Sequence, residues 1–302
     1  MGIMDVGVRE QCRMAKSSWQ HTLVPGDGVS LHLVTAAPNS SSGDPAPILF
    51  LHGFPEYWYA WKNQLEVFGA ERVAAALDMR GYGRSDKPPE VGAYDIARLV
   101  ADVAAVLDRI SPARPAVLVG HDWGGVVAWQ FAARHPERLE KLVIINAPHP
   151  AVFARELLNN PAQRLASAYV ALFRSPLAES LLRTGRFALL RRAVFEGAAP
   201  GAFSQEEQER YIAAWAQTGA LTGGLNYYRA ARFVPGEAVQ PVTTPTLVLW
   251  GENDTALLPG NLEGLEEYVP NLTVQRIPDG THWVVHEQPG VINAALQEFI
   301  GS

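Results

Sequence analysis

The residue best suited to nucleophilic chemistry is Asp122, at the centre of Gly120-His121-Asp122-Trp123-Gly124-Gly125. The motif follows an apolar run and opens a helical pattern, which is the context of a nucleophile elbow. An ionised carboxylate needs no base to attack an sp³ carbon, and it can form an ester with the enzyme. The competing interpretation is an ordinary loop in which Asp caps a helix. A dinucleotide fingerprint is excluded because Asp122 occupies the second glycine position.

A second motif, His52-Gly53-Phe54-Pro55, follows another apolar run. In this strand context the loop supplies one backbone N–H of an oxyanion hole, and the residue after the nucleophile supplies the other. The expected donors are therefore Phe54 and Trp123. Taken alone the stretch would be a simple Gly/Pro turn, but the two motifs together are far more specific.

Two later loops offer an acid and a base. Asp254, in Gly251-Glu252-Asn253-Asp254, follows an apolar run, and a carboxylate at a strand end can orient an imidazole. His282, in Thr281-His282-Trp283, precedes the last helical pattern. Nucleophile, acid and then histidine is one of the chain orders of hydrolytic triads. The sequence thus predicts a triad of Asp122, Asp254 and His282, with His286 as the fallback base.

Short apolar runs and amphipathic segments alternate along much of the chain. Strands are predicted at residues 48–51, 73–77, 116–119, 142–145 and 246–250. Helices are predicted at 96–110, 123–134 and 291–300. Continuous apolar strands suit a parallel sheet covered on both faces, so we predict a doubly wound, mostly parallel α/β sheet.

The alternation stops after Ala147, and the next strand pattern begins at Thr246. The segment between them is mostly helical, and Ser204 and Glu207 have the spacing of a capping box. We predict an N-terminal extension over residues 1–20, a core over 21–147 and 234–302, and an inserted helical cap (lid) over 148–233. A polar loop is expected at 39–47.

Composition limits the function classes. The 302-residue chain has a net charge of −6 and one cysteine, Cys12. It cannot form an intrachain disulfide, which fits a reducing compartment, and its acidity argues against nucleic acid. No run reaches the roughly 18 apolar residues of a membrane span, and the N-terminus lacks the apolar core of a signal peptide. We expect a cytoplasmic protein with no nucleic-acid or membrane partner, no metal and no cofactor; a homodimer is compatible with the sequence.

Four stretches resemble the epoxide hydrolases of the α/β-hydrolase fold. They are His52-Gly53-Phe54-Pro55-Glu56, residues 78–85, His121-Asp122-Trp123-Gly124-Gly125 and His282-Trp283. The resemblance runs from about residue 21 to the C-terminus. It implies that fold, with the helical cap inserted into it, and a small-molecule epoxide converted to a vicinal diol through an ester on Asp122.

The same resemblance implies two tyrosines from the cap that point at the substrate oxygen. Residues 169–176 look like the first tyrosine motif and residues 225–229 like the second. The matching residues are Tyr169 and Tyr228, the latter in preference to Tyr227. As general acids they could protonate the alkoxide that ring opening leaves. An aromatic substrate pocket is expected from Phe54, Trp123, Phe173 and Trp283.

Three alternatives bear on this interpretation. Haloalkane dehalogenases also resemble residues 121–124, but they usually carry Asn where this chain has Phe54. Fluoroacetate dehalogenases usually carry Arg at the positions of Trp123 and Val126. A non-catalytic receptor of the same fold would be expected to lack a triad member, and all three are present. Serine at position 122 would indicate an esterase or a lipase, so the aspartate there largely excludes these two classes.

Overall fold

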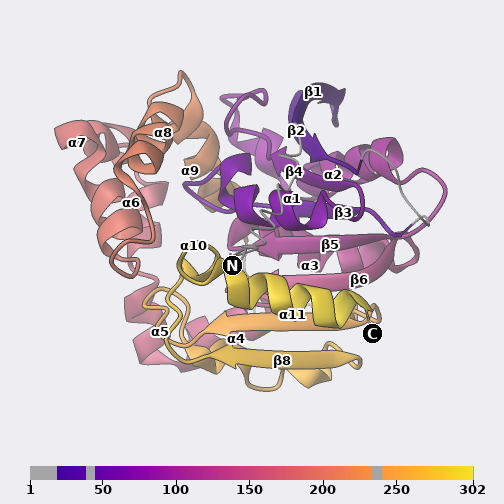
Figure 1. The fold of residues 1–302 in the computed structure, drawn as a ribbon. Coiled ribbons are helices and arrows are strands. Elements are labelled where there is room, and N and C mark those ends of the chain that lie inside the picture. The colour runs from indigo at the N-terminus through magenta and orange to yellow at the C-terminus, as the bar shows by residue number, and fades with distance from the viewer. Residues whose placement is uncertain (1–18, 39–44, 233–239, 302) are drawn as a thin grey trace, which may run out of the picture.

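The structure is a computed structural model that describes residues 19–38, 45–232 and 240–301 (Figure 1). Two predictions fall partly outside these residues and a third falls wholly outside them. They concern the N-terminal extension, the polar loop at 39–47, and the boundary between cap and core at 233–234.

The described residues form an eight-stranded sheet in the order β1-β2-β4-β3-β5-β6-β7-β8. Strand β2 pairs antiparallel with both β1 and β4, and the other neighbours pair parallel. The strands are β1 (Gln20–Pro25), β2 (Ser30–Ala36), β3 (Ile48–Leu51), β4 (Ala74–Asp78), β5 (Ala116–His121), β6 (Leu139–Ile145), β7 (Thr246–Gly251) and β8 (Leu272–Ile277).

The predicted strands correspond to β3, β4, β5, β6 and β7, whose side chains are almost all buried. Strands β1, β2 and β8 were not predicted. β1 and β8 lie at the edges and are mostly exposed, so they lack the apolar run on which the prediction relied.

Helices cover both faces of the sheet, as a doubly wound fold requires. α2 (Ile96–Ile110) and α3 (Trp123–Arg134) pack on one face against Leu49, Leu118 and Leu142. α1 (Lys62–Phe68) and α11 (Pro289–Gly301) pack on the other against Phe50, Val117 and Val143. The two core layers alternate along each strand because successive side chains point to opposite faces.

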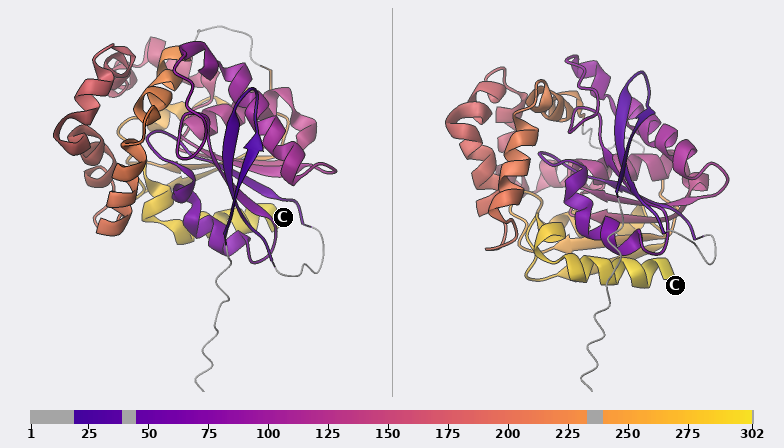
Figure 2. Two further views of the ribbon diagram at one scale, coloured as in Figure 1. Left: turned by 90° about the horizontal axis from the view of Figure 1, so that it is seen from above. Right: turned by 45° about the horizontal axis from the view of Figure 1, so that its top comes forward.

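Among the described residues, six α-helices and a π-helical turn lie between β6 and β7, at one end of the sheet (Figure 2). We call this group the helical insertion. Its α-helices are α4 (Pro150–Asn159), α5 (Pro161–Ala166), α6 (Tyr169–Arg174), α7 (Ala178–Arg191), α8 (Gln205–Trp215) and α9 (Ala220–Ala230). The predicted capping box is present, because Ser204 and Glu207 bond each other's backbone N–H at the start of α8.

The remaining helical elements are short. α10 (Val284–Glu287) follows the His282 loop, and a π-helical turn spans Arg192–Glu196. 3-10 turns lie at Trp58–Trp61, Val91–Tyr94, Pro136–Arg138, Pro259–Leu262 and Leu265–Glu267. Of the helices within the described ranges, none has both the length and the apolar character needed to cross a bilayer.

Candidate active site

Asp122 lies in a sharp turn between β5 and α3. Its backbone has φ 49° and ψ −122°, a conformation that few non-glycine residues adopt. A Cβ on Gly124 would lie 2.2 Å from the carbonyl oxygen of Leu51, and one on Gly120 would lie 2.5 Å from that of Gly124. The glycines therefore allow the turn to approach β3, and the geometry is that of the predicted elbow.

Backbone N–H groups surround the Asp122 carboxylate. The N–H of Phe54 donates to Asp122 Oδ1 at 2.7 Å, and the N–H of Trp123 also hydrogen-bonds the carboxylate. Gly53 is needed beside them, because a Cβ there would lie 2.2 Å from Asp122 Oδ1. Both predicted oxyanion donors are thus close to the predicted nucleophile.

His282 lies between two carboxylates. Its Nδ1 is 2.7 Å from Asp254 Oδ2, and its Nε2 is 3.7 Å from Asp122 Oδ2. Asp254 is itself fixed, since Oδ1 accepts from the N–H groups of Ala256 and Leu257 at 2.8 and 2.9 Å. The three predicted triad residues therefore come together from three separate loops.

The charges of the site depend on one another. Burial raises the pKa of Asp122, although His282 and His121 oppose that shift. Burial also acts to lower the pKa of His282, but Asp254 and Asp122 outweigh it and raise that pKa to about 9. At neutral pH His282 is consequently an imidazolium, held between the side chains of Asp254 and Asp122.

Tyr169 of α6 and Tyr228 of α9 lie together next to this site. Their ring centroids are 6.2 Å apart. Burial raises the pKa of each hydroxyl, and the charge of Asp122 acts in the same direction, so both stay protonated near neutral pH. The Tyr227 hydroxyl instead donates to the carbonyl oxygen of Arg80 at 2.8 Å.

Three of the four predicted pocket aromatics surround Tyr228. The centroids of Trp123, Phe173 and Phe54 lie 5.0, 5.0 and 5.5 Å from that of Tyr228. Trp283 is placed differently: its ring stands edge-on to His282, and its indole N–H donates to the carbonyl oxygen of Ala193. It therefore joins the His282 loop to the helical insertion.

Comparison with known proteins identifies the family. Residues 46–289 match the family described as alpha/beta hydrolase fold. The chain belongs to the α/β-hydrolase fold family. It is 37% identical over 287 residues to epoxide hydrolase 4 of Mus musculus, covering 92% of this chain and 78% of that protein. It is 38% identical over 278 residues to AB hydrolase superfamily protein YfhM of Bacillus subtilis (strain 168), covering 91% and 95%.

Solved structures agree with this assignment. The Bacillus megaterium epoxide hydrolase in complex with an inhibitor superimposes with a TM-score of 0.85 at 32% identity, covering 93% of this chain and all of that chain. The predicted α/β-hydrolase fold, a mostly parallel sheet with an inserted helical segment, is thereby confirmed.

Beneath the triad, this α/β hydrolase contains a buried polar cluster that the sequence did not reveal. Glu56 Oε2 is 3.0 Å from His121 Nδ1, and Glu56 Oε1 is 2.6 Å from His286 Nε2. Tyr211 of α8 also donates to Glu56 Oε1, at 3.2 Å. His121 Nε2 in turn lies 2.8 Å from the His282 carbonyl oxygen, so the cluster reaches the triad loop.

His286 belongs to this buried cluster and lies apart from the three predicted triad residues. His286 is buried against Glu56 and Phe203, whereas His282 contacts both Asp254 and Asp122. Burial would raise the pKa of Glu56, but His286 and His121 hold it well below its usual range. Glu56 stands two residues after Phe54 in the sequence. Its partners His121 and His286 are distant in the sequence, so the sequence alone did not indicate its role.

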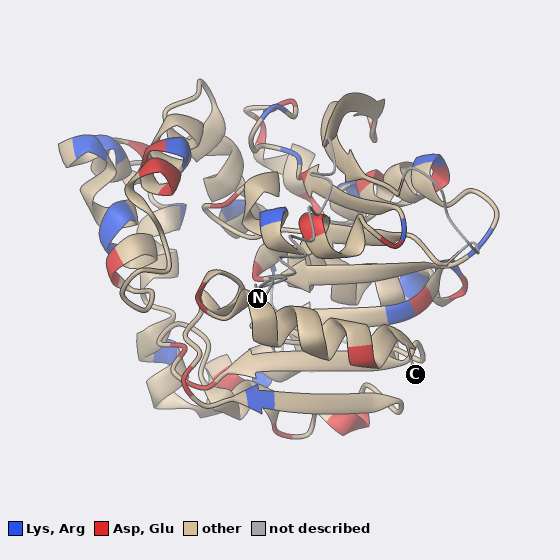
Figure 3. Ribbon diagram, in the orientation of Figure 1, with Lys and Arg blue, Asp and Glu red and all other residues tan. Residues whose placement is uncertain are grey.

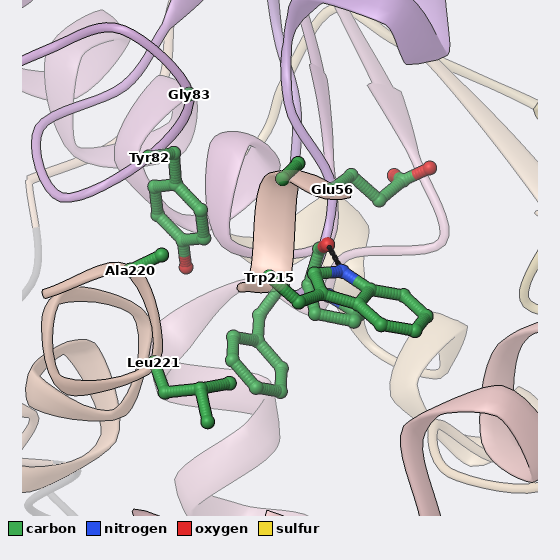
Figure 4. Close-up of a pocket in the computed structure, with 9 residues that line it drawn as sticks. Glu56, Tyr82, Gly83, Trp215, Ala220 and Leu221 are labelled. Carbon is green, nitrogen blue, oxygen red and sulfur yellow. Dashed lines mark hydrogen bonds between the residues drawn. The ribbon is translucent and has the colours of Figure 1, made fainter. Parts of the chain in front are cut away.

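A small cavity adjoins the Phe54 loop of this α/β hydrolase, between the core and the helical insertion (Figure 4). The indole N–H of Trp215 donates to the Pro55 carbonyl oxygen at 2.6 Å, and the Tyr82 hydroxyl points into the space. The insertion thus contacts the loop that holds the Phe54 donor. Within the described ranges, no group of three or more His, Cys, Asp or Glu side chains is arranged to hold a metal ion.

Proposed function

We propose that this α/β hydrolase is an epoxide hydrolase that converts a small-molecule epoxide and water to a vicinal diol. The observation that carries the proposal is the pair Tyr169 and Tyr228, two protonated hydroxyls next to a carboxylate at a nucleophile elbow. Opening an epoxide leaves an alkoxide, a strong base that needs a proton, and the two phenols can supply it. The epoxide hydrolases among its relatives support the same substrate class.

In the first step, an Asp122 oxygen attacks an epoxide carbon, and the bond from that carbon to the epoxide oxygen breaks. The released alkoxide takes a proton from Tyr169 or Tyr228. Ester formation removes the negative charge of Asp122, which is one of the two carboxylates that raise the pKa of His282. The imidazolium therefore releases a proton that restores the tyrosine, and the product is an ester, an alcohol and a neutral His282.

In the second step, neutral His282, oriented by Asp254, takes a proton from water as the water oxygen attacks the ester carbonyl. The Phe54 and Trp123 N–H groups stabilise the resulting oxyanion, and each such donor is worth roughly 100- to 1,000-fold in rate. Collapse of the intermediate breaks the bond from the Asp122 carbonyl carbon to the diol oxygen, which takes the hydroxyl proton of the intermediate as the diol leaves. Asp122 then returns as a carboxylate beside the imidazolium.

The helical insertion serves as the cap, with the cap over residues 148–233 and the core over 21–147 and 234–302. Phe54, Trp123 and Phe173 form the aromatic wall of the substrate pocket. A cytoplasmic location, which a single cysteine favours, and a homodimer remain parts of the proposal.

A dehalogenase would use the same nucleophile, but a departing halide needs no proton. The two tyrosine hydroxyls would then have no catalytic role. A non-catalytic receptor would bind a small molecule and would turn over neither epoxides nor haloalkanes. Purified protein should therefore hydrolyse styrene oxide and release no halide from bromoalkanes.

Oxygen labelling tests the ester directly. In a single turnover in ¹⁸O water, the first diol should contain unlabelled oxygen from Asp122, and the label should appear in the Asp122 peptide. Label in the first diol, with none in that peptide, would show direct attack by water and refute the covalent route.

A further inference from the structure

Helix α7 lies at the outer margin of the helical insertion, on the side away from the sheet (Figures 1 and 2). Its inner side packs Ala178, Leu182, Phe187 and Leu190 against the insertion. Its outer side exposes large apolar side chains: Leu177, just before the helix, is 63% exposed, and Leu181 and Leu189 are 42% and 47% exposed. α7 is kinked between Thr184 and Phe187, where the backbone leaves the helical conformation, so Leu177 and Leu181 lie before the kink and Leu189 lies after it. Three exposed leucines so close together form an unusually apolar surface for a segment in water.

Arginines accompany these leucines. Arg183, Arg191 and Arg192 are exposed, and among the described residues no hydrogen bond or ion pair engages their guanidinium groups. Of the acidic residues nearby, Glu179 pairs with Arg229 and Glu209 with Arg186, while the exposed Glu196 follows Arg192 by four residues and offsets one of the charges. We call the three leucines and three arginines the α7 face.

The sequence concentrates positive charge in the same region. Residues 148–232 contain ten arginines and six glutamates, with no lysine or aspartate, for a net charge of +4. The whole chain carries −6, so the other residues together carry −10. Figure 3 shows basic residues on the outer helices of the insertion. The insertion is therefore basic and the rest of the chain acidic, and residues 177–192 alone hold four arginines and one glutamate.

We propose that the α7 face docks on the surface of an anionic lipid bilayer. A helix lies in a membrane interface when exposed apolar side chains enter the acyl boundary and basic side chains meet anionic headgroups. Arginine suits that role because its planar guanidinium binds phosphate in a bidentate manner. This peripheral contact needs no membrane-spanning helix, and it departs from the expectation of no membrane partner, which rested on the lack of such a span.

Charge also argues against a second copy of this chain as the partner. A two-fold dimer through the α7 face would bring its arginines close to the same arginines of the other copy. The α7 face shares no residue with the triad or the two tyrosines, so the docking proposal and the proposed function can fail separately.

Co-sedimentation of the full chain with vesicles tests the proposal. Vesicles of phosphatidylcholine with 30% phosphatidylglycerol should bind the protein roughly 10- to 100-fold more tightly than phosphatidylcholine alone at low salt, and added NaCl should weaken the binding. The triple variant Arg183→Gln/Arg191→Gln/Arg192→Gln should lose most of that preference. Leu177→Ser/Leu181→Ser/Leu189→Ser should weaken the binding that persists at high salt.

Matched variants on the core serve as controls. Arg109→Gln/Arg134→Gln/Arg276→Gln removes the same charge from exposed core positions, and Leu23→Ser/Val91→Ser/Val291→Ser removes exposed apolar side chains there. Both should bind vesicles like the parent. Equal binding to the two vesicle types, an equal loss in the control variants, or a dimer that the α7 arginine variant dissociates would each overturn the proposal. Thermal unfolding verifies that every variant is folded.

Discussion

At the scale of single residues, the site depends on the coupling between His282 and two carboxylates. An imidazole whose pKa is about 9 is a poor base at neutral pH while Asp122 is ionised. Esterification of Asp122 removes one of the charges that stabilise the imidazolium. The proposed nucleophile thus also controls when the base becomes available, which separates the two chemical steps in time.

The variant His282→Gln should form the ester and then fail to hydrolyse it. Alkylation needs only the carboxylate and an acid, whereas the second step needs a base for water. Intact-mass measurement after styrene oxide is added should show protein plus one substrate, and His286→Gln should not accumulate this species. Full steady-state turnover by His282→Gln would remove His282 from the mechanism.

The variants Tyr169→Phe and Tyr228→Phe should each slow alkylation by roughly 10- to 1,000-fold, and the double variant should be nearly inactive on epoxides. Stopped-flow alkylation with styrene oxide measures the effect. Tyr227→Phe is the control: it should alkylate normally but lose stability by about 1 kcal/mol, because it removes the hydrogen bond to the Arg80 carbonyl. Parental alkylation by the double variant would make both tyrosines packing residues.

Local motifs were enough to predict the residues that the structure brings together at Asp122. Asp254, His282, Phe54 and Trp123 each follow a recognisable strand or precede a helix, and they all lie at that site. The roles of Glu56 and Asn146 could not be predicted in this way. Asn146 donates to Asp254 Oδ2 at 2.9 Å, and Glu56 meets His286 across 230 positions, so both roles depend on tertiary contacts.

At the scale of elements, the sequence was most informative where burial is continuous. The predicted bounds of α2 and α3 coincide with those observed. α2 has a regular apolar periodicity, whereas α3 is buried on nearly all sides and is bounded by the elbow at Asp122 and by His135-Pro136. β8 is exposed at most of its positions, so its pairing with β7 depends on backbone hydrogen bonds that leave no apolar pattern.

The elbow should be intolerant of added volume. Gly124→Ala would place a methyl group 2.2 Å from a backbone oxygen of β3, which has little room to move, and we expect a loss of at least about 1–3 kcal/mol. Gly290→Ala, at the start of α11, meets no atom within 4 Å and should be neutral or slightly stabilising. Urea unfolding of the two variants checks the difference, and equal stability would contradict the steric argument.

At the scale of the whole molecule, many polar contacts join the helical insertion to the core, such as Lys62 with Glu207 and Tyr227 with the Arg80 carbonyl. Three others lie beside the Phe54 and His282 loops. They are Tyr211 with Glu56, Trp215 with the Pro55 carbonyl, and Trp283 with the Ala193 carbonyl. All three are close to the loops that position Asp122 and His282. The insertion and the loops of Asp122 and His282 should therefore lose order together when these contacts are broken.

The variant Glu56→Gln should destabilise the protein by about 3–5 kcal/mol at pH 7, because it breaks a buried charged cluster. The folded-state pKa of Glu56 is depressed, so its contribution is present above the unfolded pKa of about 4.3 and is lost as pH falls toward the folded value. Urea unfolding should show that the difference in unfolding free energy between the parent and Glu56→Gln shrinks below about pH 4. Glu209→Gln, in an exposed ion pair, should change stability by less than about 1 kcal/mol. If the parent instead became more stable relative to Glu56→Gln as the pH fell, the depressed pKa of Glu56 would be contradicted.

The position of the helical insertion in the chain affects how such a protein can diversify. It leaves the sheet after β6 and returns at β7, and these strands are direct neighbours, with Leu142 opposite Thr246. For the pairing of these two strands the whole insertion therefore acts as one loop. The free-energy cost of closing such a loop rises by only about 0.6 kcal/mol for each doubling of its length. Recombination at these two joints would exchange the entire helical insertion, and with it the proposed cap, in one event. A replacement would need to restore the contacts to the core, among them those to Glu56 and Pro55, while the strand ends that carry Asp122, Asp254 and His282 stayed unchanged.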